Sequence, residues 1–127
     1  MITHHVDDLK NTGRHVVTDR FESTRLVVKS DNVGYSLHHT IVPEGKEVHC
    51  HYKQHFEANY CIAGEGEVYV IATGKTYPVC VGTMYLLDLH DEHILRSTNG
   101  PLHLVCVFNP PLSGAEVHDE DGSYSLD

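Results

Sequence analysis

The sequence predicts an all-β domain, and three observations support this. Extended segments dominate from residue 23 onward, turns that contain Gly or Pro separate them at regular spacing, and the 3.6-residue periodicity of long amphipathic helices is missing. This pattern is typical of a β-sandwich or β-barrel. The 127 residues have the length of one domain (1–127) with a single buried core.

Turns divide the chain into the following expected elements. A short helix is expected near 6–10, and the apolar run 26–28 ends at the polar turn cluster 29–32. The strands after this cluster alternate with turns, and they are expected at 34–42, 48–52, 55–63, 67–72, 75–79, 83–87, 93–97 and 103–108. The turns that separate them include 43–45, 64–66 and 73–74. We expect a barrel core of about 23–109 and, from the Pro, Gly and acidic residues that follow it, a C-terminal lid segment at 110–127.

Charge and hydropathy exclude two classes of partner. Lys and Arg number 9 and Asp and Glu number 18, so the formal net charge is −9, whereas a phosphate backbone requires a basic surface. No apolar run approaches the roughly 18 residues of a membrane span. Residues 1–10 contain no apolar signal-peptide core. We therefore expect a cytoplasmic protein that binds neither nucleic acid nor membranes.

The four cysteines, at positions 50, 61, 80 and 106, form no Cys-x-x-Cys pair. A zinc-finger interpretation is therefore not supported. Without an export signal we expect buried or half-buried thiols rather than disulfides.

The densest group of potential ligands is the pattern His-x-His-Tyr-x-x-His-x-Glu at 49–57. In a strand alternate side chains share a face, so His49 and His51 point the same way, and His55, Glu57 and Asn59 share a face. A Glu that faces a barrel interior is costly unless a cation meets it, and a metal ion would do so. The alternative is that Glu57 faces solvent and the histidines cap loops.

A second group lies at 82–93, where Tyr85 and Leu87 share a face and His90 and His93 lie in or beside an acidic turn. A lone Tyr on a strand is usually a packing residue. As a metal ligand it must lose a proton whose pKa is about 10, which requires a strongly Lewis-acidic ion.

These two segments resemble the two motifs of the cupin superfamily. The residues that fill the first motif are Gly45, His49, His51, Glu57 and Gly64, with a longer gap than usual before the Glu. In the second motif, at 80–85, Cys80 replaces the usual Pro and Tyr85 replaces the usual metal-binding His. The resemblance implies a cupin-type β-barrel (a double-stranded β-helix or jelly roll) with at most short helices. The usual three-His, one-Glu metal site does not carry over.

A narrower resemblance, to the ectoine synthase family of cupins, runs from Met1 to about Tyr124. The segments that carry it are 24–26, 51–58, 60–68, 87–93, 105–112 and 116–122. The most specific are Phe-Asn-Pro-Pro at 108–111 and Glu-Val-His-Asp-Glu at 116–120. The resemblance implies a homodimeric lyase of compatible-solute biosynthesis under osmotic stress. Such an enzyme closes N-γ-acetyl-L-2,4-diaminobutyrate to L-ectoine with loss of water.

The resemblance also implies the role of each site residue. The metal ligands fall on Glu57, Tyr85 and His93, and the expected metal is Fe²⁺, although other divalent ions suit such a ligand set. The substrate-contacting positions fall on Phe21, Arg25, His38, Thr40, Tyr52, His55, Phe108, Glu116 and His118. We expect Tyr52 or His55 to transfer protons, and Arg25 and Glu116 to hold the carboxylate and amino group of the substrate.

Three positions depart from the family pattern. Phe21 replaces a Trp, His38 replaces an Asn, and Asn59 replaces an apolar residue. These changes affect the affinity and the exact substrate more than the reaction class.

Two other functions fit the generic cupin features. An iron-dependent dioxygenase would take up oxygen with a thiol or diol substrate. A non-catalytic cupin that binds a small solute would bind its ligand without turnover and without dependence on Glu57.

Overall fold

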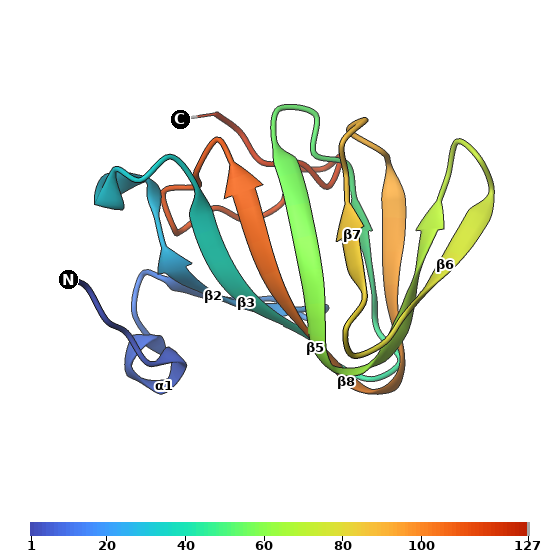
Figure 1. Ribbon diagram of the computed structural model, residues 1–127, viewed down its shortest axis with the longest axis horizontal. Coiled ribbons are helices and arrows are strands. Elements are labelled where there is room, and N and C mark those ends of the chain that lie inside the picture. The colour runs from blue at the N-terminus through green and yellow to red at the C-terminus, as the bar shows by residue number, and fades with distance from the viewer. Residues whose placement is uncertain (127) are drawn as a thin grey trace.

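The chain forms one eight-stranded antiparallel sheet that folds back on itself, as the computed structural model in Figure 1 shows; it describes residues 1–126. One short helix, α1 (Val6–Leu9), precedes the strands. The remaining elements, in chain order, are β1 (His15–Val17), β2 (Glu22–Val27), the 3-10 turn η1 (Lys29–Asp31), β3 (Ser36–Val42), β4 (Glu47–Cys50), β5 (Phe56–Val70), β6 (Lys75–Val79), β7 (Met84–Leu86) and β8 (His93–Asn109). The prediction of an all-β fold is confirmed, and so is the short helix near 6–10.

Strands β5 and β8 are long enough to take part in both halves of the folded sheet (Figure 1). The first half of β5 pairs with β7 and with the second half of β8, which also pairs with β3. The second half of β5 pairs with β6 and with the first half of β8, which also pairs with β4. The inward side chains of the two halves therefore face one another across a barrel interior.

The prediction of a turn at 64–66 is wrong, because β5 continues through these residues as a bulged strand. Gly64 has a φ of +79°, and a Cβ there would lie 2.2 Å from the carbonyl oxygen of Pro101 on β8. Glycine therefore lets the strand bend while its neighbour stays close. Likewise, the two strands expected at 93–97 and 103–108 are one bent strand, β8.

Strand β1 and the start of β2 were not predicted from the sequence. Ser23, Thr24 and Arg25 of β2 are consecutive buried residues, so the alternation of a half-exposed strand is missing there. Thr24 lies between His15 of β1 and His39 of β3 in the sheet register. Tertiary packing, rather than local pattern, therefore forms this edge of the sheet.

Residues 110–126, here named the tail, pack across one end of the barrel. The Lys29 N–H donates to the Leu112 carbonyl at 2.8 Å, and the His51 N–H donates to the Gly122 carbonyl at 2.8 Å. Leu112 is fully buried. The position of the tail is that expected of a lid segment, but opening and closing stay a prediction, and Asp127 lies outside the described residues.

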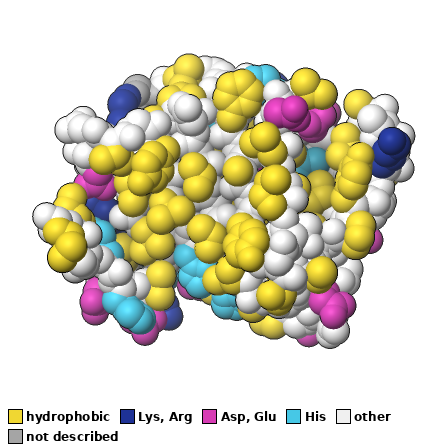
Figure 2. Space-filling view, in the orientation of Figure 1, with side chains coloured by type: hydrophobic (Ala, Val, Ile, Leu, Met, Phe, Trp, Pro, Cys, Tyr) yellow, Lys and Arg dark blue, Asp and Glu magenta, His cyan; other side chains and the backbone are white. Residues whose placement is uncertain are grey.

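Hydrophobic side chains gather on the outer face of the half of the sheet that Figure 2 presents. They include exposed residues of β5 (Phe56, Tyr60 and Ile62) and of β7 (Met84 and Leu86). Over residues 1–126, no helix has the length and apolar character needed to cross a bilayer.

Candidate functional site

Inward-facing side chains form a row across five neighbouring strands. Arg25 of β2 lies opposite His38 of β3, which lies opposite Cys106 of β8. Cys106 in turn lies opposite Asn59 of β5, and Asn59 lies opposite Tyr85 of β7. Residues far apart in sequence therefore meet at one level of the barrel because the strand register aligns them.

A cavity of about 30 Å³, here named the central cavity, lies beside this row. The predicted residues that line it are Phe21, His38, Thr40, Tyr52, Glu57, Tyr85, His93, Phe108 and His118. Its volume holds roughly one or two water molecules. The structure thus brings nine predicted residues together around one small cavity.

Burial controls the two acidic groups of the proposed ligand set. It raises the pKa of the Glu57 carboxyl to about 8, although the Asn59 amide and the Cys106 thiol beside it act in the opposite direction. Burial, followed by the charge of Glu57, raises the pKa of the Tyr85 phenol well above 10. A cation in the cavity would reverse both effects, because it stabilises a carboxylate and a phenolate.

His93 is oriented by its own backbone neighbourhood. Its Nδ1–H donates to the Asp91 carbonyl at 2.8 Å, which leaves the lone pair on Nε2. Burial lowers its pKa, so the ring is neutral at neutral pH. Its ring centroid lies 6.4 Å from that of Tyr85. A neutral imidazole with its lone pair on Nε2 is the form in which a histidine binds a metal ion.

The residues that line the central cavity can bind a metal ion through oxygen and nitrogen atoms only if Tyr85 is one of the ligands. Within residues 1–126, no three or more His, Cys, Asp or Glu side chains are grouped so as to hold a metal ion. A metal in the central cavity would therefore need the Tyr85 oxygen beside Glu57 and His93, which all line it. Such a donor set is compatible with iron and with other divalent ions.

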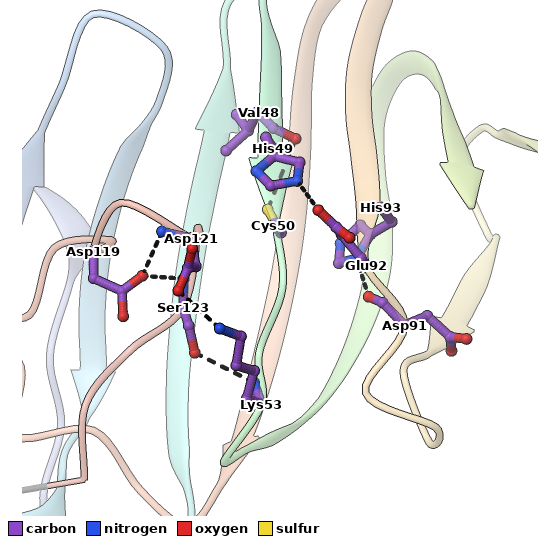
Figure 3. A network of polar contacts seen from close by, with 10 residues as sticks. All are labelled: Val48, His49, Cys50, Lys53, Asp91, Glu92, His93, Asp119, Asp121 and Ser123. Carbon is purple, nitrogen blue, oxygen red and sulfur yellow. Dashed lines mark hydrogen bonds and ion pairs between the residues drawn. The ribbon is translucent and has the colours of Figure 1, made fainter. Parts of the chain in front are cut away.

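The loop that leads to His93 is held from outside the cavity, as Figure 3 shows. His49 on β4 points to Glu92, and its Nε2 lies 2.6 Å from Oε2 of that carboxylate. The same loop is tied at His90, whose Nδ1–H donates to the Tyr52 carbonyl at 2.8 Å. His49, which fills the first His position of the generic cupin motif, is therefore part of a clamp and does not line the cavity.

Tail residues close the mouth of the central cavity. The Tyr52 hydroxyl is hydrogen-bonded to His118 Nε2 at 2.8 Å, and the ring of Tyr124 stacks on Tyr52 at 5.2 Å. Burial, and then the charge of Arg25, lowers the pKa of His118 to about 4, so this imidazole is neutral. Tyr52 and His118 thus form a hydrogen-bonded pair that can pass a proton.

Arg25 is a fully buried cation behind this pair. Its guanidinium donates to Ser23 Oγ at 2.9 Å and to the Gly114 carbonyl at 3.1 Å, and its Nη2 lies 3.5 Å from the Tyr124 hydroxyl. No carboxylate within residues 1–126 forms an ion pair with it. Arg25 does not line the central cavity, but a buried charge without an anion is costly, so an anionic group that reached Arg25 would be favoured.

Two predicted residues, His55 and Glu116, line a different cavity, of about 40 Å³, together with Lys29 and Pro110. His55, Glu57 and Asn59 are all buried and alternate with less buried neighbours, which fits the predicted shared face, but His55 lies just before β5 and lines the other cavity. Burial would raise the pKa of Glu116, but hydrogen bonds from backbone N–H groups of the tail outweigh it and lower that pKa.

Nine residues of the central cavity were missed as site residues: Ser23, Val42, Val48, Cys50, Asn59, Leu95, Leu104, Cys106 and Tyr124. Cys50 alternates with His49 on β4, so the inward position of one residue implies the outward position of the other. Tyr124 is the one Phe, Tyr or Trp residue in the sequence from 110 to 127, which was the available signal.

Comparison with known proteins gives consistent relationships. A family model described as "Ectoine synthase" matches residues 1–127. The L-ectoine synthase of Vibrio parahaemolyticus is 50% identical over 127 residues, with 99% of this chain and 98% of that protein covered. The crystal structure of ectoine synthase from P. lautus is 47% identical, with a TM-score of 0.88 over 96% of this chain and 87% of that one. A cupin 2 conserved barrel domain protein from Salinispora arenicola, 17% identical with a TM-score of 0.67 over 85% of this chain and 87% of that one, shares the barrel fold.

Proposed function

The chain belongs to the ectoine synthase family, and from this premise we infer that it is an L-ectoine synthase, a hydro-lyase on the cupin barrel. The observation that carries the inference is the match to L-ectoine synthases at about half identity over nearly the whole chain. The reaction converts N-γ-acetyl-L-2,4-diaminobutyrate to the cyclic amidine L-ectoine with loss of water.

The chemistry sets clear demands on the site. The neutral α-amino nitrogen attacks the acyl carbon, which forms a C–N bond and a tetrahedral carbinolamine. The acyl oxygen then leaves as water, which carries both protons of the amino group, and a C=N bond remains. A group that removes a proton from nitrogen and delivers one to oxygen is therefore required, and so is a pocket that folds the flexible chain onto itself.

Arg25 and the Tyr52–His118 pair are suited to these demands. We propose that Arg25 binds the substrate carboxylate, because it is a buried cation without an anionic partner in residues 1–126. We propose that Tyr52 transfers the proton with neutral His118 as its partner. His55 and Glu116 line the other cavity, so a direct role for either requires rearrangement of the tail.

The proposed cofactor is Fe²⁺, held by Glu57, Tyr85 and His93. When bound it would act as a Lewis acid that polarises the acyl carbonyl. The two properties of the chain that support this proposal are the buried Glu57 carboxyl with the half-buried Tyr85 phenol at the same cavity, and an imidazole whose Nε2 lone pair is free.

We also propose that the enzyme is a cytoplasmic homodimer that serves the response to osmotic stress. The family resemblance implies each of these properties. The exposed apolar side chains of β5 and β7 offer a surface for self-association (Figure 2). Light scattering of the purified protein tests the dimer.

The test of function is anaerobic incubation of the iron-loaded protein with N-γ-acetyl-L-2,4-diaminobutyrate, followed by proton NMR. Ectoine formed by the intact protein and lost in Glu57→Ala supports the proposal. A protein that holds iron and forms no ectoine would contradict it. Oxygen uptake with thiol or diol substrates would then favour a dioxygenase, and binding without turnover would favour a solute-binding cupin.

A further inference from the structure

Asn59 presents an unsatisfied amide group to the central cavity. Its residue exposure is only 2%, and its side-chain nitrogen Nδ2 has no hydrogen-bond partner. It projects inward from β5 between Cys106 and Tyr85 in the strand register, two residues after Glu57 on the same face. Buried polar groups in native proteins are nearly always hydrogen-bonded, so such a group requires an explanation.

The Glu57 carboxyl is an acceptor that lies beside Asn59. The Asn59 amide interacts with it closely enough to lower the pKa of that carboxyl, but Nδ2 has no acceptor with full hydrogen-bond geometry. A neutral N–H donor recognises an oxygen or another lone pair rather than an ammonium group. An acceptor atom of a ligand in the cavity would satisfy it.

We infer that Asn59 is a further substrate-contacting residue that determines specificity, and that its N–H donates to the acyl oxygen of the bound substrate. The inference rests on the proposed function. The substrate has two oxygen-bearing groups that could accept the Asn59 N–H. Its carboxylate is proposed to bind Arg25, which lies farther along the same row of residues. The acyl oxygen is thereby assigned to the end of the row that holds Tyr85, with Glu57 beside it.

The hydrogen bond serves the reaction directly. The acyl oxygen gains negative charge as the amino nitrogen attacks, and it leaves as water once it is protonated. A fixed donor that faces this oxygen stabilises the transition state more than the ground state. Asn59 therefore favours an acylated diamine over the diamine itself.

The experiment compares wild type with Asn59→Leu, which keeps a similar side-chain size and removes the donor. Tyr60→Phe is the control, because Tyr60 follows Asn59 on β5 but faces outward. Four quantities are measured: kcat/KM for the acetylated substrate, the inhibition constant of L-2,4-diaminobutyrate, the iron affinity by chelator competition, and the Tm.

We expect Asn59→Leu to lower kcat/KM at least tenfold, because loss of one such donor costs roughly 10²–10³ in kcat in characterised enzymes. The inhibition constant of the unacylated diamine should stay within about twofold, because it does not depend on the acyl contact. Both variants are compared at saturating Fe²⁺, because loss of the Asn59 amide removes one of the contacts that lower the pKa of Glu57. The Tm should hold or rise, because an unpartnered polar group is replaced by an apolar one. Tyr60→Phe should match wild type in all four.

An unchanged kcat/KM in Asn59→Leu would overturn the inference while the proposed function stands. An equal loss for both ligands, recovery of kcat/KM at saturating Fe²⁺ or a lower Tm would also overturn it, because each would make Asn59 a structural or Glu57-positioning residue. Absence of turnover in wild type would overturn the proposed function and this inference with it.

Discussion

His38 is predicted to make the protein less stable as the pH falls. The residue is 1% exposed, and burial followed by the charge of Arg25 lowers its pKa from 6.5 to about 3. Its Nε2 lies 3.0 Å from Ser36 Oγ, and that oxygen already accepts a hydrogen bond from the Leu112 N–H at 3.0 Å. Either atom of the His38–Ser36 pair can be the donor, so the effect of pH rests on the burial and the Arg25 charge that keep the His38 ring neutral.

The size of the effect follows from the two pKa values. The unfolded chain takes up a proton at His38 below a pKa of 6.5 and the folded chain does so only near 3, so stability is present above 6.5 and is lost as the pH falls. At about pH 5 the unfolded group is about 1.5 pH units below its pKa, which corresponds to a loss of about 2 kcal/mol at roughly 1.4 kcal/mol per unit.

Urea denaturation of wild type and His38→Asn at about pH 8 and about pH 5 measures this contribution. The free energy of unfolding should fall by about 2 kcal/mol more in wild type than in the variant, because the other buried histidines titrate equally in both. A difference between the two proteins that changes by less than about 0.5 kcal/mol would refute the argument that burial holds His38 neutral.

Three further predictions concern the bend, the proton path and the metal. Gly64→Ala should lower the free energy of unfolding by about 3 kcal/mol or more, because the new Cβ would meet the Pro101 carbonyl oxygen. The control Gly74→Ala, which has a similar positive φ but open space around the new Cβ, should lower it by only about 1 kcal/mol. Equal losses for the two variants in urea titrations would contradict this. Tyr52→Phe should lower kcat far more than substrate affinity, because the hydroxyl bonded to His118 moves the proton; a changed affinity with unchanged kcat would argue against it. Chelation should abolish ectoine formation and Fe²⁺ should restore it, and full activity of the metal-free protein, verified by elemental analysis, would rule out the metal proposal.

Local sequence signals were sufficient for much of the fold. The Gly- and Pro-rich turns and the short extended segments predicted an all-β chain correctly, because turn chemistry acts over a few residues. The signals failed at Gly64, where a glycine with positive φ bends a continuous strand instead of ending it. A bulge and a turn use the same residue type, and only the neighbouring strand distinguishes them.

The sequence motifs predicted the residues of the site, and the tertiary structure decided which of them lie close together. Alternation along β5 places Glu57 and Asn59 on one face, but His55, before the strand, lines another cavity. No local pattern sets the register that aligns Arg25 with Tyr85 across five strands, because register depends on pairing over long sequence distances. The sequence by itself thus determined the chemistry available to the protein. Long-range strand pairing and the packing of the tail decided which groups are buried together and which pKa values are shifted, because burial is a property of the folded chain.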